Sequence, residues 1–399
     1  MEVLLLSNGI TPDHMGGLQR YVRELAGALQ RTGAAEVTVV ARRRDEDLPL
    51  TEVAADGVRI VRFAGPDKRN PLYAAAYPYA ATRAARAAIA ARPRHVLHAH
   101  FALQAAPLAL GRRPYAYTFH APAHREIASE RAGSYALAAP LERGLVGAAR
   151  VLERRVVRRA ARVVTLSDYM RDQVAALDPG AGSQTTVMPG GVDTTRCTPG
   201  AGVDHPWATD PGTFLLVTAR RLVERTGVAA LVNAMPTILR TIPSAKLAVI
   251  GSGPQREQIE HLISRHRLED HVRLFGRVSD DDLVGWFRSA RLVVLPTLEL
   301  EGFGLATAEA LACGTPVLGT PAGATPELLG PLSADLISRD TGSDAIADAI
   351  TEIAGRPGAL DELAARARAR VHPEMGWDAI AQRHLQLYEQ VGHVQRTSI

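Results

Sequence analysis

Two glutamates that flank a glycine-rich turn carry most of the chemistry suggested by this sequence. They are Glu301 and Glu309, in the segment LELEGFGLATAEALACGTP at positions 298–316. Gly302 and Gly304 between them allow the backbone to approach a ligand closely, with N–H groups directed at an anion such as a phosphate. Two carboxylates beside a phosphate would repel it unless they bind something else, and hydroxyl groups are their natural partners. The pair is therefore predicted to hold sugar or ribose hydroxyls around a diphosphate.

The elements expected to position this pair are a strand before the turn and a helix after it. The apolar run RLVVLP at positions 291–296 predicts a buried strand that ends at a proline. From Leu305 onward, the small-residue run LATAEALAC predicts a helix that ends near Gly314. Glu309 then lies about one turn inside that helix. The ordinary alternative is two surface glutamates near a helix start, where the helix dipole favours them. The Gly-Phe-Gly turn and the buried strand weaken this alternative.

The segment EGFGLATAEALACGTPVLGTPAGATPELL at positions 301–329 resembles the signature of the retaining glycosyltransferases of family 4. Those enzymes carry a glutamate, seven residues and a second glutamate on the two-domain GT-B fold. The resemblance extends over most of the chain and implies that Glu309 binds ribose hydroxyls while Glu301 binds the donor sugar. It implies phosphate binding by the backbone N–H groups of Gly302, Phe303, Gly304 and Leu305.

Arginines in the segment TARRLVERTG at positions 218–227 supply cations directly after another predicted strand. Cations there would stabilise the charge that builds on a departing nucleoside diphosphate. The family pattern is an arginine, a lysine five positions later and then a glycine. Counted from Arg221, the lysine position is occupied by Thr226, which departs from the pattern. Arg225 is expected to reach the phosphate instead, because its planar fork suits phosphate. The alternative is that Arg225 faces solvent or pairs with Glu224.

Five further positions gain a role mainly from the resemblance. Gly16 and Gly17 lie between the first predicted strand and a helix at 18–30, where a Gly-Gly pair alone predicts only a turn. The resemblance makes them the loop that faces the donor diphosphate or the acceptor. An isolated histidine is usually structural, but the resemblance implies that His120, in YTFHAPAH, contacts the donor sugar. It also implies that Gly251 lines the donor site and that Val278 lies in the loop that meets the nucleobase.

Several patterns argue against other chemistries. The turn IGSGPQRE has Arg256 where a dinucleotide fingerprint has its third glycine, which disfavours a dehydrogenase. His98 and His100 have a metal-like spacing, but no carboxylate or cysteine completes a site, so strand-end packing is favoured. The acidic run at 280–282 follows Ser279, which reads as the N-cap of a helix with acidic residues in its first turn. Neither a metal nor a cofactor is expected.

Composition describes an ordinary globular protein. With 399 residues, 46 % hydrophobic and 22 % charged, the chain is long enough for two domains. No apolar run is long enough to span a bilayer, and the opening MEVLLLSNG reads as a first strand rather than a signal peptide, so a cytoplasmic location is expected. The net charge is +4, almost all of the positive charge is arginine, and this bias is weak evidence for nucleic acid. Cys197 and Cys313 cannot form a disulfide framework, and Cys313 is expected to be a small packed residue.

The densest basic run is RVLERRVVRRAAR at Arg150–Arg162. Apolar residues at helical spacing between the arginines predict an amphipathic helix with a solvated basic face. The second interpretation is peripheral contact with anionic lipid, as in several relatives that glycosylate lipids.

Strand and helix signals alternate along the chain and restart after a stretch rich in Pro, Gly, Thr and Asp at 190–212, which is expected to be the interdomain linker. This alternation predicts α/β layers with parallel sheets. With the resemblance, it indicates a GT-B fold of two doubly wound Rossmann-like domains facing a central cleft. An acceptor-binding domain is expected at 1–200 and a nucleotide-sugar-binding domain at 201–399. The last helix, at about 377–391, is expected to pack back on the first domain.

The resulting expectation is a retaining, metal-independent glycosyltransferase. It would move a sugar from a UDP- or GDP-linked donor to a hydroxyl acceptor, which is a small molecule, a lipid or a saccharide. Two alternatives stay open: a GT-B nucleotide-sugar epimerase or hydrolase, and a nucleotide-sugar binding protein without turnover. The sequence leaves open the donor base and whether Arg225 replaces the missing lysine.

Overall fold

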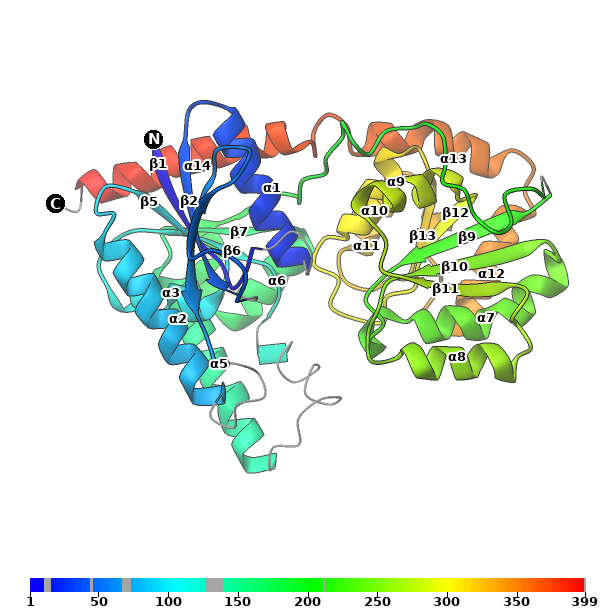
Figure 1. The fold of residues 1–399 in the computed structure, drawn as a ribbon, viewed down its shortest axis with the longest axis horizontal. Helices are drawn as coiled ribbons and strands as arrows, with labels where there is room; N and C mark the ends of the chain where they lie inside the picture. The colour runs from blue at the N-terminus through cyan, green and yellow to red at the C-terminus, as the bar shows by residue number, and fades with distance from the viewer. Residues whose placement is uncertain are drawn as a thin grey trace. The chain divides into compact units, whose positions relative to one another are not determined.

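The computed structural model describes residues 1–10, 16–43, 46–66, 73–122, 124–125, 139–210 and 212–397, and the chain forms two compact α/β units (Figure 1). The first unit comprises Met1–Gly191 together with Trp377–Ile399, and the second comprises Val192–Gly376. The predicted fold class, two Rossmann-like α/β domains, is confirmed in the form of these two units.

The first unit contains eight strands and its major helices in alternation. In chain order they are β1 Glu2–Leu6, α1 Gly17–Arg31, β2 Glu36–Arg43, β3 Thr51–Val53, β4 Arg59–Ala64, α2 Tyr73–Ala90, β5 Val96–Ala99, α3 Ala102–Leu110, β6 Ala116–Phe119, α5 Ala139–Arg159, β7 Arg162–Thr165, α6 Asp168–Leu177, β8 Thr185–Val187 and α14 Trp377–Thr397.

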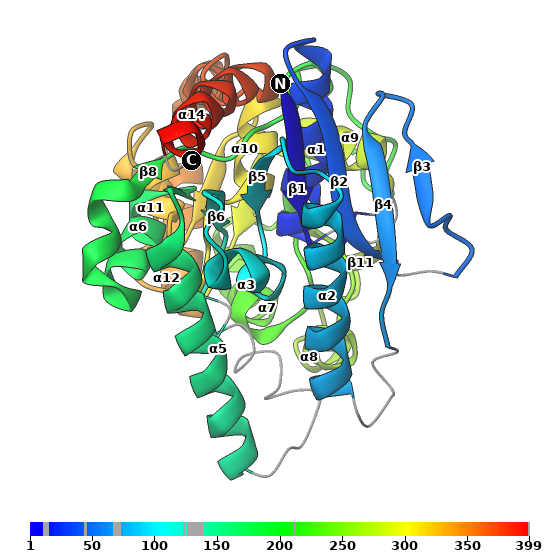
Figure 2. The same cartoon turned by 90° about the vertical axis from the view of Figure 1, so that its left-hand side faces the viewer.

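The strands of the first unit form one sheet in the order β3-β4-β2-β1-β5-β6-β7-β8. Neighbouring strands are parallel, except that β3 pairs antiparallel with β4 at the edge. Helices α1 and α14 pack together on one face, and α2, α3 and α5 cover the other (Figure 2). Because both faces are covered, a central strand such as β1 is apolar along its length, and Val3 to Leu6 are fully buried. Each such leucine contributes roughly 2 kcal/mol by leaving water.

The second unit repeats the alternation on a smaller sheet. In chain order its elements are β9 Phe214–Ala219, α7 Val228–Thr241, β10 Ala245–Ile250, α8 Arg256–Arg265, β11 Val272–Gly276, α9 Asp280–Ser289, β12 Leu292–Leu295, α10 Leu305–Ala312, β13 Val317–Gly319, α11 Thr325–Leu329, α12 Ser343–Ala354 and α13 Ala359–Ala367.

The five strands of the second unit run in the order β11-β10-β9-β12-β13, and all neighbours are parallel. Helix α7 packs against α8 and α12 on one face of the sheet, and α9 packs against α10 on the other. The strand order reverses direction after β11, when the chain crosses back to form β12 beside β9. In open parallel sheets, ligands bind at the carboxyl edge near such a reversal. The expected ligand edge of this unit therefore lies after β9 and β12.

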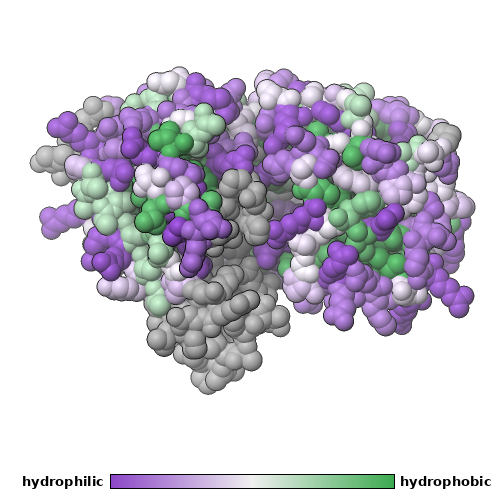
Figure 3. All heavy atoms as spheres, in the orientation of Figure 1, coloured by the Kyte–Doolittle hydropathy of each residue, from purple (hydrophilic) through white to green (hydrophobic). Residues whose placement is uncertain are grey.

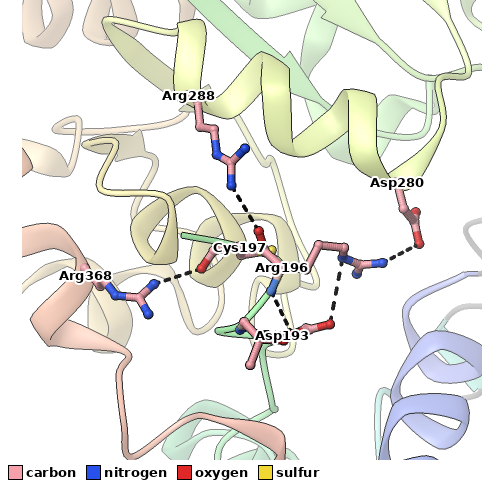
Figure 4. A network of polar contacts seen from close by, with 7 residues as sticks. Asp193, Arg196, Cys197, Asp280, Arg288 and Arg368 are labelled. Carbon is pink, nitrogen blue, oxygen red and sulfur yellow. Dashed lines mark hydrogen bonds and ion pairs between the residues drawn. The ribbon is translucent and has the colours of Figure 1, made fainter. Parts of the chain in front are cut away.

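The boundary between the units differs from the prediction. It follows Gly191 rather than residue 200, and much of the stretch that was expected to be a linker belongs to the second unit. Arg288 on α9 donates to the carbonyl of Thr198 at 2.7 Å, and Arg368 donates to the carbonyl of Cys197 at 2.9 Å. Figure 4 shows both guanidinium groups pointing toward this segment. Composition alone suggested an interdomain linker, whereas arginines distant in sequence hold the backbone of this segment in the second unit.

The C-terminal helix is longer than predicted. Helix α14 extends from Trp377 to Thr397 rather than ending near residue 391, and Trp377–Ile399 is assigned to the first unit. Its residues Ile380, Tyr388 and Val391 are fully buried, so the helix forms part of the core of that unit.

The surface of both units is mainly polar on the face drawn in Figure 3, with smaller apolar groups between the polar side chains. Among the described residues, the large apolar side chains that are exposed all belong to the first unit: Met1, Leu50, Val53, Tyr79, Leu110 and Val151. None of the described helices combines the length and the apolar character needed to cross a bilayer.

Candidate functional site

Loops that follow neighbouring parallel strands meet at the carboxyl edge of the second sheet. Gly227, after β9, adopts a φ of +71°, and a Cβ there would lie 1.7 Å from the carbonyl oxygen of Pro296, after β12. Gly251, after β10, adopts a φ of +127°, and a Cβ there would lie 1.9 Å from the carbonyl oxygen of Arg220. These positions require glycine because three loop backbones pass in direct contact. The edge is consequently rigid.

The predicted turn and helix after β12 are confirmed. Helix α10 begins at Leu305, and Gly304 caps it in the left-handed region with a φ of +91°. Within the helix, Glu309 is buried, with 6 % of its surface exposed. The first turn of a helix leaves backbone N–H groups without intrahelical partners and carries a partial positive charge. The turn from Gly302 through Phe303 to Gly304 thus leads into a backbone site suited to an anion.

Glu301 is held at this edge by Arg220, one of the three arginines in the segment 218–227, whose pairing with Glu301 was not predicted. Nη1 of Arg220 lies 2.8 Å from Oε2 of Glu301, with side chains only 10 % and 15 % exposed. Nη2 of Arg220 donates to the hydroxyl of Thr297 at 3.0 Å. The family pattern was counted from Arg221, whereas Arg220 carries the ion pair. Sequence reasoning named Arg220 as a cation of this loop but gave it no partner.

Arg221 and Arg225 lie in the same loop but have different surroundings. Arg221 is exposed, and its carbonyl oxygen accepts a hydrogen bond from the Thr226 hydroxyl at 2.7 Å. Thr226 is buried and also donates to the carbonyl of Val223, so the residue at the family lysine position closes a local turn. Arg225 is half-buried, and its carbonyl accepts the N–H of Leu298 at 2.8 Å. Its backbone is thus fixed beside the loop that carries Glu301, and a phosphate role stays a prediction.

Gly251 and Val278 also lie in the second unit. The contact of Gly251 with the Arg220 carbonyl explains by itself why glycine occurs there, so this glycine gives no independent sign of a ligand. Val278 is half-buried in the loop between β11 and α9. Its expected contact with a nucleobase stays a prediction.

Gly16 and Gly17 start α1 in the first unit, as predicted. Gly16 is the N-cap residue, with an extended φ of −77°, and its N–H donates to Oε1 of Gln19 at 3.1 Å. A Cβ on Gly16 would meet no atom of the described residues within 4 Å. In contrast with Gly251, the residues that the structure describes give no packing reason for glycine at position 16.

His120 lies at the end of β6, at the margin of a buried histidine and tyrosine cluster. Its Nε2 is 3.1 Å from Nδ1 of His100, and its ring packs edge-on against Tyr21 with centroids 5.0 Å apart. His98 lies beside His100 and bonds Tyr388 of α14 through Nδ1 at 2.8 Å. The cluster is completed by Thr118, which bonds His98 at 2.8 Å, and by His384, which approaches the Tyr21 hydroxyl at 3.3 Å.

Burial keeps these histidines neutral. Desolvation lowers the pKa of His120 to about 3 and the pKa of His384 to about 4. Burial, followed by the neighbouring histidines, places the pKa of His98 and His100 well below the ordinary value. The strand-end packing expected for His98 and His100 is confirmed, because both side chains are fully enclosed. A neutral His120 offers a hydrogen-bonding nitrogen rather than a positive charge.

The acidic run after β11 has the predicted structural role. Ser279 caps α9, and its side chain accepts the N–H of Asp282, with Asp280, Asp281 and Asp282 in the first turn. Among the residues that the structure describes, no group of three or more histidine, cysteine, aspartate or glutamate side chains is arranged to hold a metal ion.

Comparison with known proteins connects these features to a family. Residues 15–196 match the model of Glycosyltransferase Family 4, and residues 204–370 match that of Glycosyl transferases group 1. A D-inositol 3-phosphate glycosyltransferase from Pseudarthrobacter chlorophenolicus is 30% identical over 325 residues, which cover 77% of this chain and 74% of that protein. A GDP-mannose-dependent alpha-(1-6)-phosphatidylinositol monomannoside mannosyltransferase from Mycobacterium tuberculosis is 28% identical over 400 residues, covering 95% and 96% of the two chains.

The fold comparison agrees with the family models. The sucrose-phosphate synthase from Thermosynechococcus elongatus superposes with a TM-score of 0.80 at 24% identity, over 98% of this chain and 99% of that one. Two family models together span both units, and a relative at 30% identity aligns over most of its length. The chain therefore belongs to glycosyltransferase family 4, has the GT-B fold and is a glycosyltransferase that uses a nucleotide-sugar donor.

Proposed function

We propose that this enzyme is a retaining, metal-independent glycosyltransferase that moves a sugar from a UDP- or GDP-linked donor to a hydroxyl acceptor. The observation that carries the proposal is the arrangement at the carboxyl edge of the second sheet. Glu301, with a side chain 15 % exposed, directly precedes the turn into α10, whose first N–H groups suit a phosphate. A carboxylate for hydroxyls and a helix N-terminus for phosphates fit the two ends of one activated sugar.

The remaining roles follow the same division. Glu309 would bind the ribose hydroxyls, and the backbone from Gly302 to Leu305 would bind the diphosphate. Arg221 and Arg225 would stabilise the negative charge that builds as the glycosidic bond breaks, which removes the need for a metal ion. The acceptor hydroxyl would attack from the face that the leaving group departs, through an oxocarbenium-like state. Its proton would pass to the departing phosphate oxygen, so configuration is retained without a protein nucleophile.

The acceptor is best sought first among molecules that carry an inositol ring. One relative is named for D-inositol 3-phosphate and another for a phosphatidylinositol mannoside, and together they support this class. We propose that the first unit binds the acceptor, and that His120 contacts the donor sugar through its neutral imidazole. Acceptor binding by the first unit and donor contact by His120 both contribute to the same transfer reaction, so one transfer assay tests both roles.

The test incubates the protein with radiolabelled UDP-glucose or GDP-mannose, alone and with inositol phosphate or phosphatidylinositol vesicles. Transfer gives a labelled acceptor whose anomeric configuration, read by NMR, equals that of the donor. Excess EDTA should leave the rate unchanged. Replacing Glu301 with glutamine is expected to lower transfer by about a hundredfold or more, because a charged hydrogen-bond acceptor is lost in the transition state.

Glu362→Gln is the matched control, since Glu362 is exposed on α13, outside the loops of the site. Product of inverted configuration would overturn the retaining mechanism, and inhibition by EDTA would overturn metal independence. A changed donor without any transfer indicates an epimerase or hydrolase, and binding without diphosphate release indicates a non-catalytic protein.

We also propose that the first unit contacts anionic lipid through the C-terminal half of α5. Arg150, Arg154 and Arg158 are exposed there, and Val151 between them is 70% exposed. Arg155 donates to the carbonyl of Ala109, which brings α5 beside Leu110, itself 66% exposed. Exposed apolar side chains surrounded by arginines suit the boundary of an anionic membrane.

Flotation with vesicles tests this contact. Vesicles that contain phosphatidylinositol should carry the protein, neutral phosphatidylcholine vesicles should not, and Val151→Asp combined with Arg158→Ala should weaken binding. Equal flotation of this variant and the wild type would remove the proposal. The transfer reaction to a water-soluble acceptor is independent of this result.

A further inference from the structure

Arg220 is the least expected charged residue of the site. Its guanidinium group spans from the end of β9 to the loop after β12, where Nη1 reaches Glu301 Oε2 at 2.8 Å and Nη2 reaches the Thr297 hydroxyl at 3.0 Å. Thr297 is fully buried, and its own hydroxyl lies 3.5 Å from the same carboxylate oxygen. The three side chains form one closed group in which Oε2 of Glu301 is the shared acceptor.

Both ends of this ion pair are attached to fixed backbone. The N–H of Arg220 donates to the carbonyl of Ile250 at 2.9 Å, and its carbonyl packs directly on Gly251. The carbonyl of Glu301 accepts the N–H of Ala324 at 2.9 Å, after β13. The ion pair therefore joins two rigid points, and little conformational entropy remains to be lost when it forms.

Two polar atoms of the pair are unused. Within the described part of the chain, Oε1 of Glu301 has no hydrogen-bond partner, and Nε of Arg220 is buried without one. Buried polar atoms without partners are rare, because each costs free energy that a hydrogen bond would recover. Nε of Arg220 has almost no accessible surface, whereas Oε1 of Glu301 is not among the buried atoms without a partner, so Oε1 is the atom to which a bound ligand would donate a hydroxyl.

The charge of the pair matters as much as its geometry. A lone carboxylate next to a diphosphate raises the energy of the bound anion, since the interaction of like charges is strong in a partly buried site. Arg220 cancels that charge at a distance of 2.8 Å. The carboxylate can then accept a hydroxyl without repelling the phosphates.

We infer that Arg220 is a positioning residue for the donor. It fixes Glu301 by Oε2, so that Oε1 is presented to the sugar hydroxyls, and it neutralises Glu301 beside the diphosphate. This inference rests on the proposed function, because it assumes that Glu301 binds the sugar of a nucleotide-sugar donor. It adds a residue next to the arginine that the family pattern identifies.

The first test measures the affinity for UDP and GDP by titration calorimetry, in the absence of any sugar. Arg220→Ala is expected to weaken nucleotide binding by about tenfold or more, because Glu301 is left with an uncompensated charge. Adding Glu301→Gln to that variant removes the charge and should restore much of the affinity. A purely structural role of Arg220 would not produce this recovery, so a double variant that binds no better than Arg220→Ala overturns the inference.

The second test measures transfer from the donor that shows turnover. Arg220→Ala should reduce kcat/KM by about a hundredfold, and its effect should disappear in the Glu301→Gln background, because coupled residues are not additive. Arg220→Lys keeps the charge and should keep nucleotide affinity, but it should recover transfer only in part, since a lysine cannot hold Glu301 and Thr297 together. Thermal unfolding of each variant shows whether the second unit is folded.

Arg291→Ala is the matched control, because Arg291 forms an exposed ion pair with Asp361 at 2.6 Å in the same unit, and it should change neither affinity nor transfer. If Glu301→Gln transfers sugar at the wild-type rate, the proposed function has the wrong site. If Glu301→Gln is inactive while Arg220→Ala behaves as wild type, only the role of Arg220 is wrong.

Discussion

Two buried polar clusters, one in each unit, satisfy their polar groups in opposite ways. In the first unit, His98, His100, His120 and His384 associate with Tyr21, Thr118 and Tyr388 without any formal charge. In the second unit, Arg220 and Glu301 form an ion pair whose side chains stay 10% and 15% exposed. Burial suppresses charge in the first cluster, whereas a partner of opposite sign preserves it in the second.

The difference separates the anchoring role of the first cluster from the ligand-binding role that we propose for the second. His384 and Tyr388 lie on α14, and Tyr388 bonds His98 of β5 across 290 residues of sequence, so the neutral cluster attaches the C-terminal helix to the sheet. A charged pair costs more to bury, and it is best placed where a polar ligand completes its hydrogen bonds. His120 belongs to the neutral cluster but lies at its half-buried margin, where a ligand contact and an anchoring contact are compatible.

The largest expected effect is an acid instability that is greater in the first unit, where four buried histidines have lowered pKa values. In the unfolded chain a histidine has a pKa near 6.5, whereas burial lowers the pKa of His120 to about 3 and that of His384 to about 4. Below pH 6.5 the unfolded state thus binds protons that the folded state does not, and stability falls as pH falls. The free energy of unfolding of the first unit should fall by several kcal/mol between pH 6.5 and pH 4, roughly 3 kcal/mol for each fully shifted histidine.

Tryptophan fluorescence can separate the units in this experiment. Trp377 packs against Tyr21 in the first unit, with ring centroids 5.2 Å apart, whereas Trp207 and Trp286 lie in the second. A Trp207→Phe, Trp286→Phe variant reports unfolding of the first unit, and Trp377→Phe reports the second. Equal thermal midpoints for the first unit at pH 4.5 and pH 7 would show that the histidines are not held neutral.

The second prediction compares a glycine that the fold requires with one that it does not. Gly251→Ala should destabilise the second unit by about 3 kcal/mol, because its positive φ and its contact with the Arg220 carbonyl both exclude a Cβ. Gly16→Ala should change the stability of the first unit by less than about 0.5 kcal/mol, since its backbone is extended and its surroundings are open.

Thermal unfolding and sugar transfer are measured on both variants. If the loop at Gly16 faces the donor or acceptor, Gly16→Ala should lower transfer without lowering stability. A Gly16→Ala variant that is both active and stable would show that Gly16 forms an ordinary turn without a role in binding.

Apolar runs and turn residues predicted most of the scaffold. The strands at Glu2–Leu6 and Leu292–Leu295 lie where the opening segment and the run at 291–296 predicted them, because a parallel strand covered on both faces is apolar throughout. The short strands β3 and β13 were not predicted, since three residues carry no periodic signal. Local chemistry was likewise predictable where it acts over a few residues, as for Ser279 and for the Gly304 turn.

The sequence could not predict which side chains from distant segments contact one another. Adjacent arginines at the end of a strand point to different sides, so the family pattern counted from Arg221 could not show that Arg220 pairs with Glu301. No spacing links His98 to Tyr388. Nor did the sequence show that Cys197 and Cys313, both free and buried, lie within hydrogen-bonding contact in the second unit.

The third prediction addresses one bond of the neutral cluster. Tyr388→Phe removes the hydroxyl that bonds Nδ1 of His98 at 2.8 Å and leaves a buried nitrogen without its partner. The first unit should lose about 2 kcal/mol, with no change in the second unit. Tyr79→Phe is the control, because Tyr79 is 66% exposed. A Tyr388→Phe variant as stable as the control would mean that packing alone, and not this hydrogen bond, attaches α14.

The smallest effect is expected at the surface, where helices α1 and α14 meet. Arg31 of α1 and Asp378 of α14 form an ion pair at 3.4 Å with side chains 55% and 85% exposed. Water and salt screen such a pair, so Arg31→Ala should cost less than about 1 kcal/mol, and the loss should shrink further in 0.5 M salt. Tyr21→Phe, which breaks the buried contact with His384 between those helices, should cost more and show no salt dependence. A larger loss for Arg31→Ala than for Tyr21→Phe would mean that surface charge, rather than the neutral cluster, holds α14 to the first unit.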